Sequence, residues 1–140
     1  MSPAHRLVHG LAFTLALAGS AHAFDLSVEV LNPKLLQGSI NAAVYTQAEG
    51  WLKDTQALGA QRLPVADKTV LVFRNLPAGS YAVSLFHDEN GNGVMDRNVI
   101  GLPLERYGFS RDARATMGPP SFADAAFELK ADTHISITLK

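Results

Sequence analysis

Strict alternation of apolar and polar residues is the feature of this sequence that most constrains its fold. The alternation occurs in short runs bounded by Gly, Pro, Asn and Asp, and each run is typical of a β-strand with one buried face. The runs of this form are DLSVEVLN, GSINAAVYT, GSYAVSLFHD, AAFELK and HISITLK. A further run, KTVLVFRNL, is more continuously apolar, which indicates a central strand buried on both faces.

Together these runs predict an all-β domain. Short strands without a convincing amphipathic helix indicate an antiparallel β-sandwich of about seven strands, with the seventh near residues 99–102. The last two runs are joined by Ala131 and Asp132, a spacing typical of a tight hairpin. The segment AEGWLKDTQALGA forms either one or two helical turns or an irregular connection.

Residues 1–23 have the form of a secretory signal peptide. His5 and Arg6 precede a short apolar stretch, and AHA at positions 21–23 has the small-x-small form of a signal peptidase site. The stretch is too short to cross a bilayer comfortably, with an uncleaved anchor as the alternative. We therefore expect cleavage after Ala23, export to the periplasm or the extracellular medium, and one domain over residues 24–140.

Composition excludes several classes of partner and chemistry. The sequence contains no cysteine, so it forms no disulfide, thiolate metal site or catalytic thiol. Removal of Arg6 with the leader leaves a net charge of −2, without the basic excess that a nucleic-acid-binding protein needs. We expect a monomer with no membrane span after signal cleavage.

The residues also argue against catalysis. Beyond the leader the only histidines are His87 and His134, and the sequence has neither a G-x-S-x-G nor an H-E-x-x-H motif. We expect a protein that is not an enzyme. A hydrolase is the weakest alternative, and it requires a concave pocket in which His87 or Glu105 meets other titratable groups.

The turn at residues 75–79, NLPAG, joins two of the predicted strands. Pro77 presets the backbone angle, and Gly79 is expected to take the left-handed conformation that the turn requires. The motif NLPAGSY resembles the corresponding connection in transthyretin-like and carboxypeptidase-regulatory-like sandwich domains. The resemblance implies a prealbumin-like or immunoglobulin-like topology, which usually serves a binding or structural role.

The stretch DENGNGVMD matches nine positions of a calcium loop of the EF-hand type. The expected oxygen ligands are Asp88, Asn90, Asn92, Val94 through its carbonyl, and Asp96. The match then fails, because Val99 stands where a bidentate Glu is required. Two ligands are neutral, so the pattern supports only a weak Ca²⁺ site unless Glu105 folds back to supply the missing carboxylate.

A purely structural interpretation of the same loop is open. Asx-turns at Asn90 and Asn92, with Gly91 and Gly93 at positive φ, make a compact turn without any metal. Glu105 then caps backbone amides or pairs with a neighbouring arginine.

The connection from Asp88 to Ser121 is too long for an ordinary loop. Its aromatic residues, Tyr107, Phe109 and Phe122, are expected to pack it onto the sheet.

The basic residues Arg106, Arg111 and Arg114 have two interpretations. In the first, they bind an anionic glycan, lipid headgroup or acidic peptide. In the second, they form a solvated face paired with nearby acids.

Three motifs carry a family resemblance: HDENGNGVMD, GLPLERYGFS and GPPSFADAAF. With them, nearly all of the chain after the leader resembles a widespread family of small exported bacterial proteins, catalogued as a domain of unknown function. The resemblance implies a β-sandwich and export, while the family carries no established activity.

These observations predict an exported, non-enzymatic β-sandwich module. We expect it to bind a cell-envelope or extracellular partner through residues 88–110. The alternative is a calcium-stabilised structural domain that uses the loop from Asp88 to Asp96.

Overall fold

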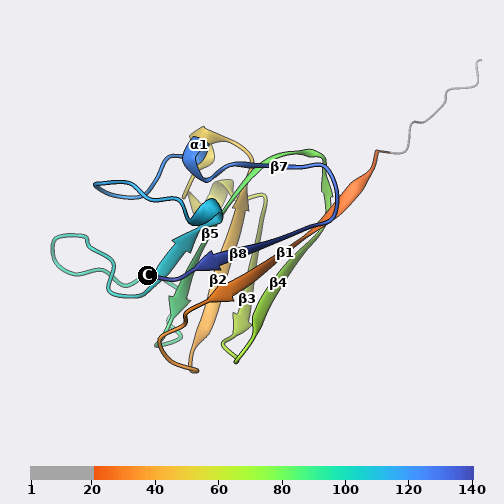
Figure 1. Ribbon diagram of the computed structural model, residues 1–140. Coiled ribbons are helices and arrows are strands. Elements are labelled where there is room, and N and C mark those ends of the chain that lie inside the picture. Colours follow the sequence, from red (N-terminus) through yellow and green to blue (C-terminus); the bar gives the residue numbers. More distant parts are fainter. Residues whose placement is uncertain (1–20) are drawn as a thin grey trace, which may run out of the picture.

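Two β-sheets pack face to face in the computed structural model, which describes residues 21–140 (Figure 1). The smaller sheet has the strand order β4-β1-β8 and the larger has the order β3-β2-β5-β6, with β7 also paired to β5. The strands are β1 (Ala23–Leu31), β2 (Ser39–Tyr45), β3 (Gly59–Pro64), β4 (Thr69–Pro77), β5 (Gly79–Asp88), β6 (Tyr107–Phe109), β7 (Phe127–Leu129) and β8 (Thr133–Thr138). The helical segments are η1 (Ala48–Gly50), η2 (Asp54–Gln56), η3 (Ser110–Asp112) and α1 (Phe122–Ala125).

The all-β sandwich prediction is confirmed, and alternation is its cause. In β1 the apolar residues Leu26, Val28 and Val30 are buried between the sheets, while the residues between them are only half-buried. The larger sheet contributes alternate residues of β2 and β5 to the same core. The predicted leader lies outside the described residues except for its last three positions. No helix among residues 21–140 is long and apolar enough to span a membrane.

The last two strands do not form the predicted hairpin. β7 pairs with β5 in the larger sheet, whereas β8 pairs with β1 in the smaller one. The chain therefore crosses from one sheet to the other through residues 130–132. As a consequence β8 runs parallel to β1, and the sandwich is not wholly antiparallel.

The strand that is buried on both faces is β5, not β4. β4 lies at the edge of the smaller sheet, and its residues alternate between buried and half-exposed. β5 lies inside the larger sheet, and its outer face is covered by the long connection. The strand predicted near residues 99–102 is absent from the described chain, where only an isolated bridge joins Arg97 to Pro103. Two other strands escaped the prediction: β3 carries a single large apolar residue, Leu63, and β6 is only three residues long within the long connection.

A second apolar cluster covers the outer face of β5. The predicted packing of Tyr107, Phe109 and Phe122 is confirmed, and Trp51 lies among them. The Trp51 ring centroid is 5.8 Å from that of Phe109 and 5.9 Å from that of Phe122. The Trp51 Nε1–H also donates to the carbonyl of Pro120 at 2.9 Å. The segment around Trp51 forms two 3₁₀ turns, η1 and η2, as the helical alternative predicted.

The turn between β4 and β5 uses a different residue from the one predicted. Asn75 has a positive φ of 57°, and Gly79 is not among the residues with positive φ. The Asn75 amide donates to the Asp25 carboxylate at 3.0 Å, which stabilises this conformation. The hydroxyl of Tyr81 closes the turn by donating to the carbonyl of Pro77 at 2.6 Å.

Candidate binding loop at one end of the sandwich

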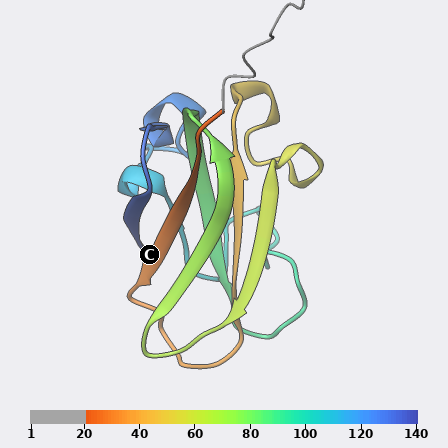
Figure 2. The ribbon, with the colours of Figure 1, turned by 90° about the vertical axis from the view of Figure 1, so that its right-hand side faces the viewer.

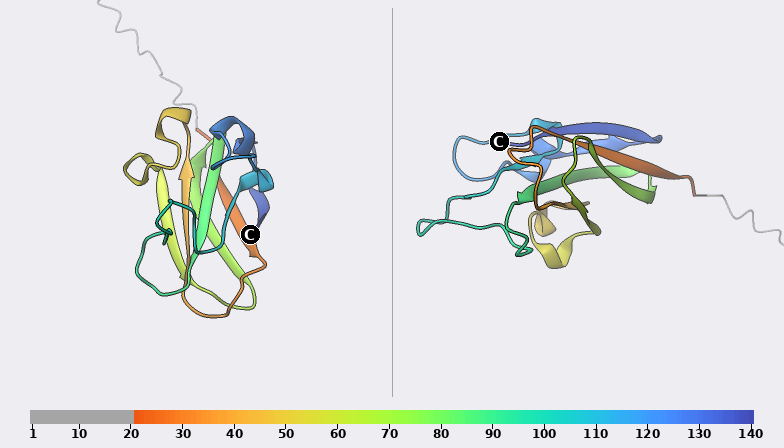
Figure 3. Two further views of the ribbon diagram at one scale, coloured as in Figure 1. Left: turned by 90° about the vertical axis from the view of Figure 1, so that its left-hand side faces the viewer. Right: turned by 90° about the horizontal axis from the view of Figure 1, so that it is seen from below.

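The segment 89–106 leaves the end of β5 and projects beyond the strands (Figure 3). It begins beside β2, because Ser39 is paired with Asp88 in the larger sheet. It returns at β6, which is also paired with β5. Both ends of the segment are therefore held by the same central strand.

Asp88 organises the first part of this segment. Its side chain is fully buried, and its two oxygens accept hydrogen bonds from three successive backbone amides. The amide donors are Gly91 at 2.8 Å and Asn92 at 3.1 Å to Oδ1, and Gly93 at 2.8 Å to Oδ2. Side chains of the neighbouring strands also donate to Oδ2, from Asn41 at 3.3 Å and Arg62 at 3.2 Å.

The electrostatics of Asp88 follow from these contacts. Burial alone raises the pKa of its carboxyl. The hydrogen bonds from the Gly93 amide, the Asn41 side chain and the Gly91 amide, with the charge of Arg62, outweigh burial and hold the pKa below its usual value of 3.8. Asp88 is thus a buried anion that the loop backbone solvates.

Both predicted Asx-turns are present. The Asn90 side-chain oxygen accepts from the Asn92 amide at 3.2 Å, and the Asn92 oxygen accepts from the Val94 amide at 3.1 Å. The amide nitrogens of the same two side chains donate to the Asp96 carboxylate, at 2.6 Å and 2.8 Å. Gly91 and Gly93 take the expected positive φ values of 75° and 83°.

Glu105 folds back onto the start of the loop. Its carboxylate is buried and accepts from the Glu89 amide at 3.0 Å and from the Asp96 amide at 3.1 Å. We call Asp88, Glu105 and the amides that they bind the anchor. Glu105 thereby fills the capping role that the sequence offered as an alternative to metal binding.

The side-chain oxygens of the predicted calcium ligands thus accept hydrogen bonds within the chain. Asp88 and Glu105 accept from backbone amides, and Asp96 accepts from Asn90 and Asn92. Within residues 21–140 no group of three or more His, Cys, Asp or Glu residues is placed to hold a metal ion. The residue types of this loop resemble those of an EF-hand loop, but their side-chain oxygens accept hydrogen bonds from N–H groups.

Residues 94–104, which we call the arm, are ordered by their own polar groups. The Asn98 side-chain oxygen accepts from the amides of Ile100 at 3.1 Å and Leu102 at 2.9 Å. The Asn98 amide donates to the Leu102 carbonyl at 2.9 Å, and the Leu104 amide donates to the Asp96 carbonyl at 2.8 Å. The arm is therefore a defined turn rather than an unsupported loop.

The large aliphatic side chains of the arm face solvent. Their exposed fractions range from 56% for Leu102 to full exposure for Val99. The complete set is Val94, Val99, Ile100, Leu102 and Leu104. Sequence reasoning missed this feature, because it treated residues 99–102 as a strand. The signal was the run VIGLPL, which is apolar without alternation.

A family model described as "Uncharacterized protein conserved in bacteria (DUF2141)" matches residues 28–137, from within β1 to within β8. The chain belongs to the DUF2141 family. The match confirms the expected family of unknown function, and it contains both the anchor and the arm. No curated protein and no solved structure matches the chain.

His87 and Arg111 of this DUF2141 chain lie apart from the other candidate residues, whereas Arg106 and Arg114 line two hollows that share Tyr107 and Lys140. His87 is fully buried in the sandwich, where its Nε2 lies 2.6 Å from the carbonyl of Gln37 and its Nδ1 has no hydrogen-bond partner among residues 21–140. Asp88 follows it on the opposite face of β5. Arg106 and Arg111 donate to the carbonyls of Asn32 and Ala126, and so face different parts of the chain.

Proposed function

We propose that this chain is an exported, non-enzymatic binding module that holds a cell-envelope partner through residues 88–110. The observation that carries the proposal is the arm. The Asn98 side chain bonds to the backbone of the arm, while five large aliphatic side chains of the arm face water. Exposure of these side chains does not stabilise the fold. Contiguous exposed apolar surface on soluble domains commonly marks an interaction site.

Preorganisation supports the same proposal. The anchor holds both ends of the arm, and Asn98 holds its tip, so little conformational entropy remains to be lost on binding. The proposed export rests on the leader-like residues 1–23. Cleavage after Ala23 removes only the first residue of β1, whose pairing with Pro77 is the outermost of the β1–β4 ladder.

Retention by bacterial envelopes tests the proposal. The exported chain is mixed with isolated envelopes of its parent bacterium and sedimented. Val99→Ser with Ile100→Ser should leave the chain in the supernatant. The control is Leu58→Ser with Met117→Ser, which removes exposed apolar groups outside the arm and should still sediment. Equal retention of both double variants contradicts a role for the arm.

A calcium-stabilised structural domain is the second candidate. The observation that favours it is the position of Glu105, which reaches the same loop as Asp88 and Asp96. Binding of Ca²⁺ by this loop requires the Asn90 and Asn92 amides to turn their oxygens inward. A thermal melt with and without millimolar Ca²⁺ distinguishes the candidates. A rise in Tm with Ca²⁺ that Asp96→Asn abolishes supports the calcium-stabilised domain, and an unchanged Tm excludes it.

A further inference from the structure

Exposed apolar side chains gather at one end of the sandwich. The β1–β2 loop, residues 32–38, lies against the start of segment 89–106, and a Cβ placed on Gly38 would overlap the carbonyl oxygen of Asp88. Figure 2 shows both segments at the same end. Of the ten large apolar side chains exposed among the described residues, these two segments hold seven: Leu35, Leu36, Val94, Val99, Ile100, Leu102 and Leu104.

Basic side chains lie immediately beside this apolar end. Lys34, Arg106 and Lys140 line a hollow of about 280 Å³, together with Pro103 and Leu104 of the arm. Lys140 belongs to the same end because Leu31 and Thr138 are paired at the ends of β1 and β8.

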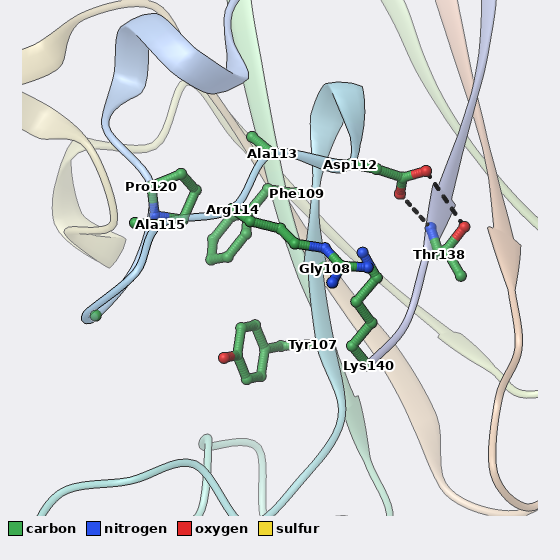
Figure 4. A pocket seen from close by; sticks show the side chains of 11 residues that line it. Tyr107, Gly108, Phe109, Asp112, Ala113, Arg114, Ala115, Pro120, Thr138 and Lys140 are labelled. Carbon is green, nitrogen blue, oxygen red and sulfur yellow. Dashed lines mark hydrogen bonds between the residues drawn. The ribbon is translucent and has the colours of Figure 1, made fainter.

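A second hollow adjoins the first. It has a volume of about 230 Å³ and shares Tyr107 and Lys140 with its neighbour. In Figure 4 the side chains of Arg114 and Lys140 extend toward one another beside Gly108, while the Asp112 carboxylate turns away to Thr138. Two like charges that converge in this way repel each other, and an anion between them removes the repulsion.

The four basic residues Lys34, Arg106, Arg114 and Lys140 form none of the salt bridges found in residues 21–140. Three side-chain carboxylates line the two hollows. Asp112 is bound to Thr138 and Glu105 to two backbone amides, which leaves Glu89 as the carboxylate without such a bond. Arg106 donates one N–H group to the Asn32 carbonyl, and the side chains of Lys34, Arg114 and Lys140 donate no hydrogen bond found in residues 21–140. The remaining N–H groups are therefore available to an external anion.

We propose that this end of the sandwich binds the surface of an anionic lipid bilayer. The arm and the leucines of the β1–β2 loop enter the acyl region, and the four basic side chains contact headgroup phosphates behind them. Apolar contact combined with attraction to anionic headgroups is how peripheral proteins hold membranes. The inference rests on the proposed function and names the partner as lipid.

The shape and composition of the arm favour lipid over a protein partner. The segment that contains it projects beyond the strands (Figure 3), and Val99 and Ile100 are fully exposed and three-quarters exposed. Energetic centres of protein interfaces are enriched in Trp, Tyr and Arg within packed pockets, whereas the exposed apolar residues here are all aliphatic. A fluid acyl layer accepts such side chains without a matching groove.

Vesicle flotation tests the inference. The exported chain, with its processing checked by mass spectrometry, is mixed with vesicles of phosphatidylcholine alone or of equal parts phosphatidylglycerol and phosphatidylcholine. Binding to the anionic vesicles should be roughly tenfold tighter or more, and should weaken with added salt. Equal binding to both vesicles, or binding to neither, overturns the inference.

Two variant pairs separate the apolar and basic contributions. Val99→Ser with Ile100→Ser should abolish flotation, whereas Leu58→Ser with Met117→Ser should not. Lys34→Glu with Arg114→Glu should remove the preference for anionic vesicles. Lys53→Glu with Lys130→Glu makes the same change of charge on exposed residues outside both hollows and should preserve the preference. A preference that survives Lys34→Glu with Arg114→Glu contradicts the basic contacts.

Comparison with the envelope experiment separates the two proposals. If envelopes retain the chain through the arm while neither vesicle does, the partner is an envelope component other than lipid. The lipid inference is then wrong, and the proposed function stands. If neither envelopes nor vesicles retain the chain, both proposals are wrong.

Discussion

The anchor and the arm belong to one connection and distribute their side chains in opposite ways. At the anchor, the charged groups of Asp88 and Glu105 are buried and hydrogen-bonded. At the arm, aliphatic groups such as Val99 and Ile100 are exposed. A folded segment normally takes its local stability from the burial of apolar side chains, whereas this connection takes it from hydrogen-bonded polar residues. The apolar side chains of the arm are therefore available for a partner.

Removal of Asp88 should break the anchor most severely. Asp88→Ala removes the buried carboxylate that accepts from three backbone amides and from Asn41 and Arg62, and we expect a loss of about 3 to 5 kcal/mol in the free energy of unfolding. Urea unfolding measures the loss. The control, Asp67→Ala, changes an exposed acid with no hydrogen bond among those found, and should stay within about 0.5 kcal/mol of the parent.

A methyl group at Gly38 should separate the β1–β2 loop from the anchor. Gly38 has a φ of 73°, and its added Cβ meets the Asp88 carbonyl, so Gly38→Ala should cost about 2 to 4 kcal/mol. Gly118→Ala is matched in conformation, with a φ of 68°, but its Cβ meets nothing within 4 Å. It should cost about 1 kcal/mol of backbone strain. Equal costs in chemical unfolding would show that the two loops do not pack together.

Glu105→Ala should loosen the anchor without disturbing the tip of the arm. The amides of Glu89 and Asp96 lose their acceptor, so their hydrogen exchange should accelerate, with a loss of about 1 to 3 kcal/mol in stability. The Leu102 amide, held by Asn98, should keep its protection. Faster exchange at Leu102 as well would show that the arm depends on the anchor. Glu128→Ala serves as an exposed control.

Acid should weaken the anchor through Asp88. Its pKa is lower in the folded chain than the usual value of 3.8, so its contribution to stability is complete above that value and is lost as the pH falls toward the folded pKa. Protonation should cost less than removal of the side chain, because one oxygen still accepts. Urea unfolding from pH 6 downward should show a decline that Asp88→Asn flattens; an equally steep decline in the variant would assign the effect to other groups.

Changes at the arm should affect stability least. Val99 and Ile100 already face solvent, so Val99→Ser with Ile100→Ser should alter the free energy of unfolding by no more than about 0.5 kcal/mol. Thermal and urea unfolding measure the change. A loss of several kcal/mol would mean that these side chains are packed in solution, and the contrast between anchor and arm would disappear.

Local patterns predicted the parts of the fold that neighbouring residues decide. The alternating runs correspond to β1, β2, β5, β7 and β8, and the Asx-turns at Asn90 and Asn92 formed as expected. Errors arose where a distant segment decides the outcome. β5 is buried on both faces because Phe109 and Ala125 cover it, and no pattern within β5 records that cover.

The candidate site divides in the same way. The sequence identified Asp88, Asn90, Asn92 and Asp96 as one cluster, and it posed the question of where Glu105 lies. Only the tertiary structure placed the Glu105 carboxylate on the amides of Glu89 and Asp96, because that contact depends on how the arm turns between them.

By itself the sequence determined six of the eight described strands, the compact turn after β5 and the family, since alternation and turn chemistry act between residues close along the chain. The tertiary structure decided that β8 joins β1 in parallel and that the arm presents Val99 and Ile100 to solvent. Those outcomes depend on which surfaces meet across the sandwich. An apolar side chain is buried only if another segment covers it, and no segment of residues 21–140 covers the arm.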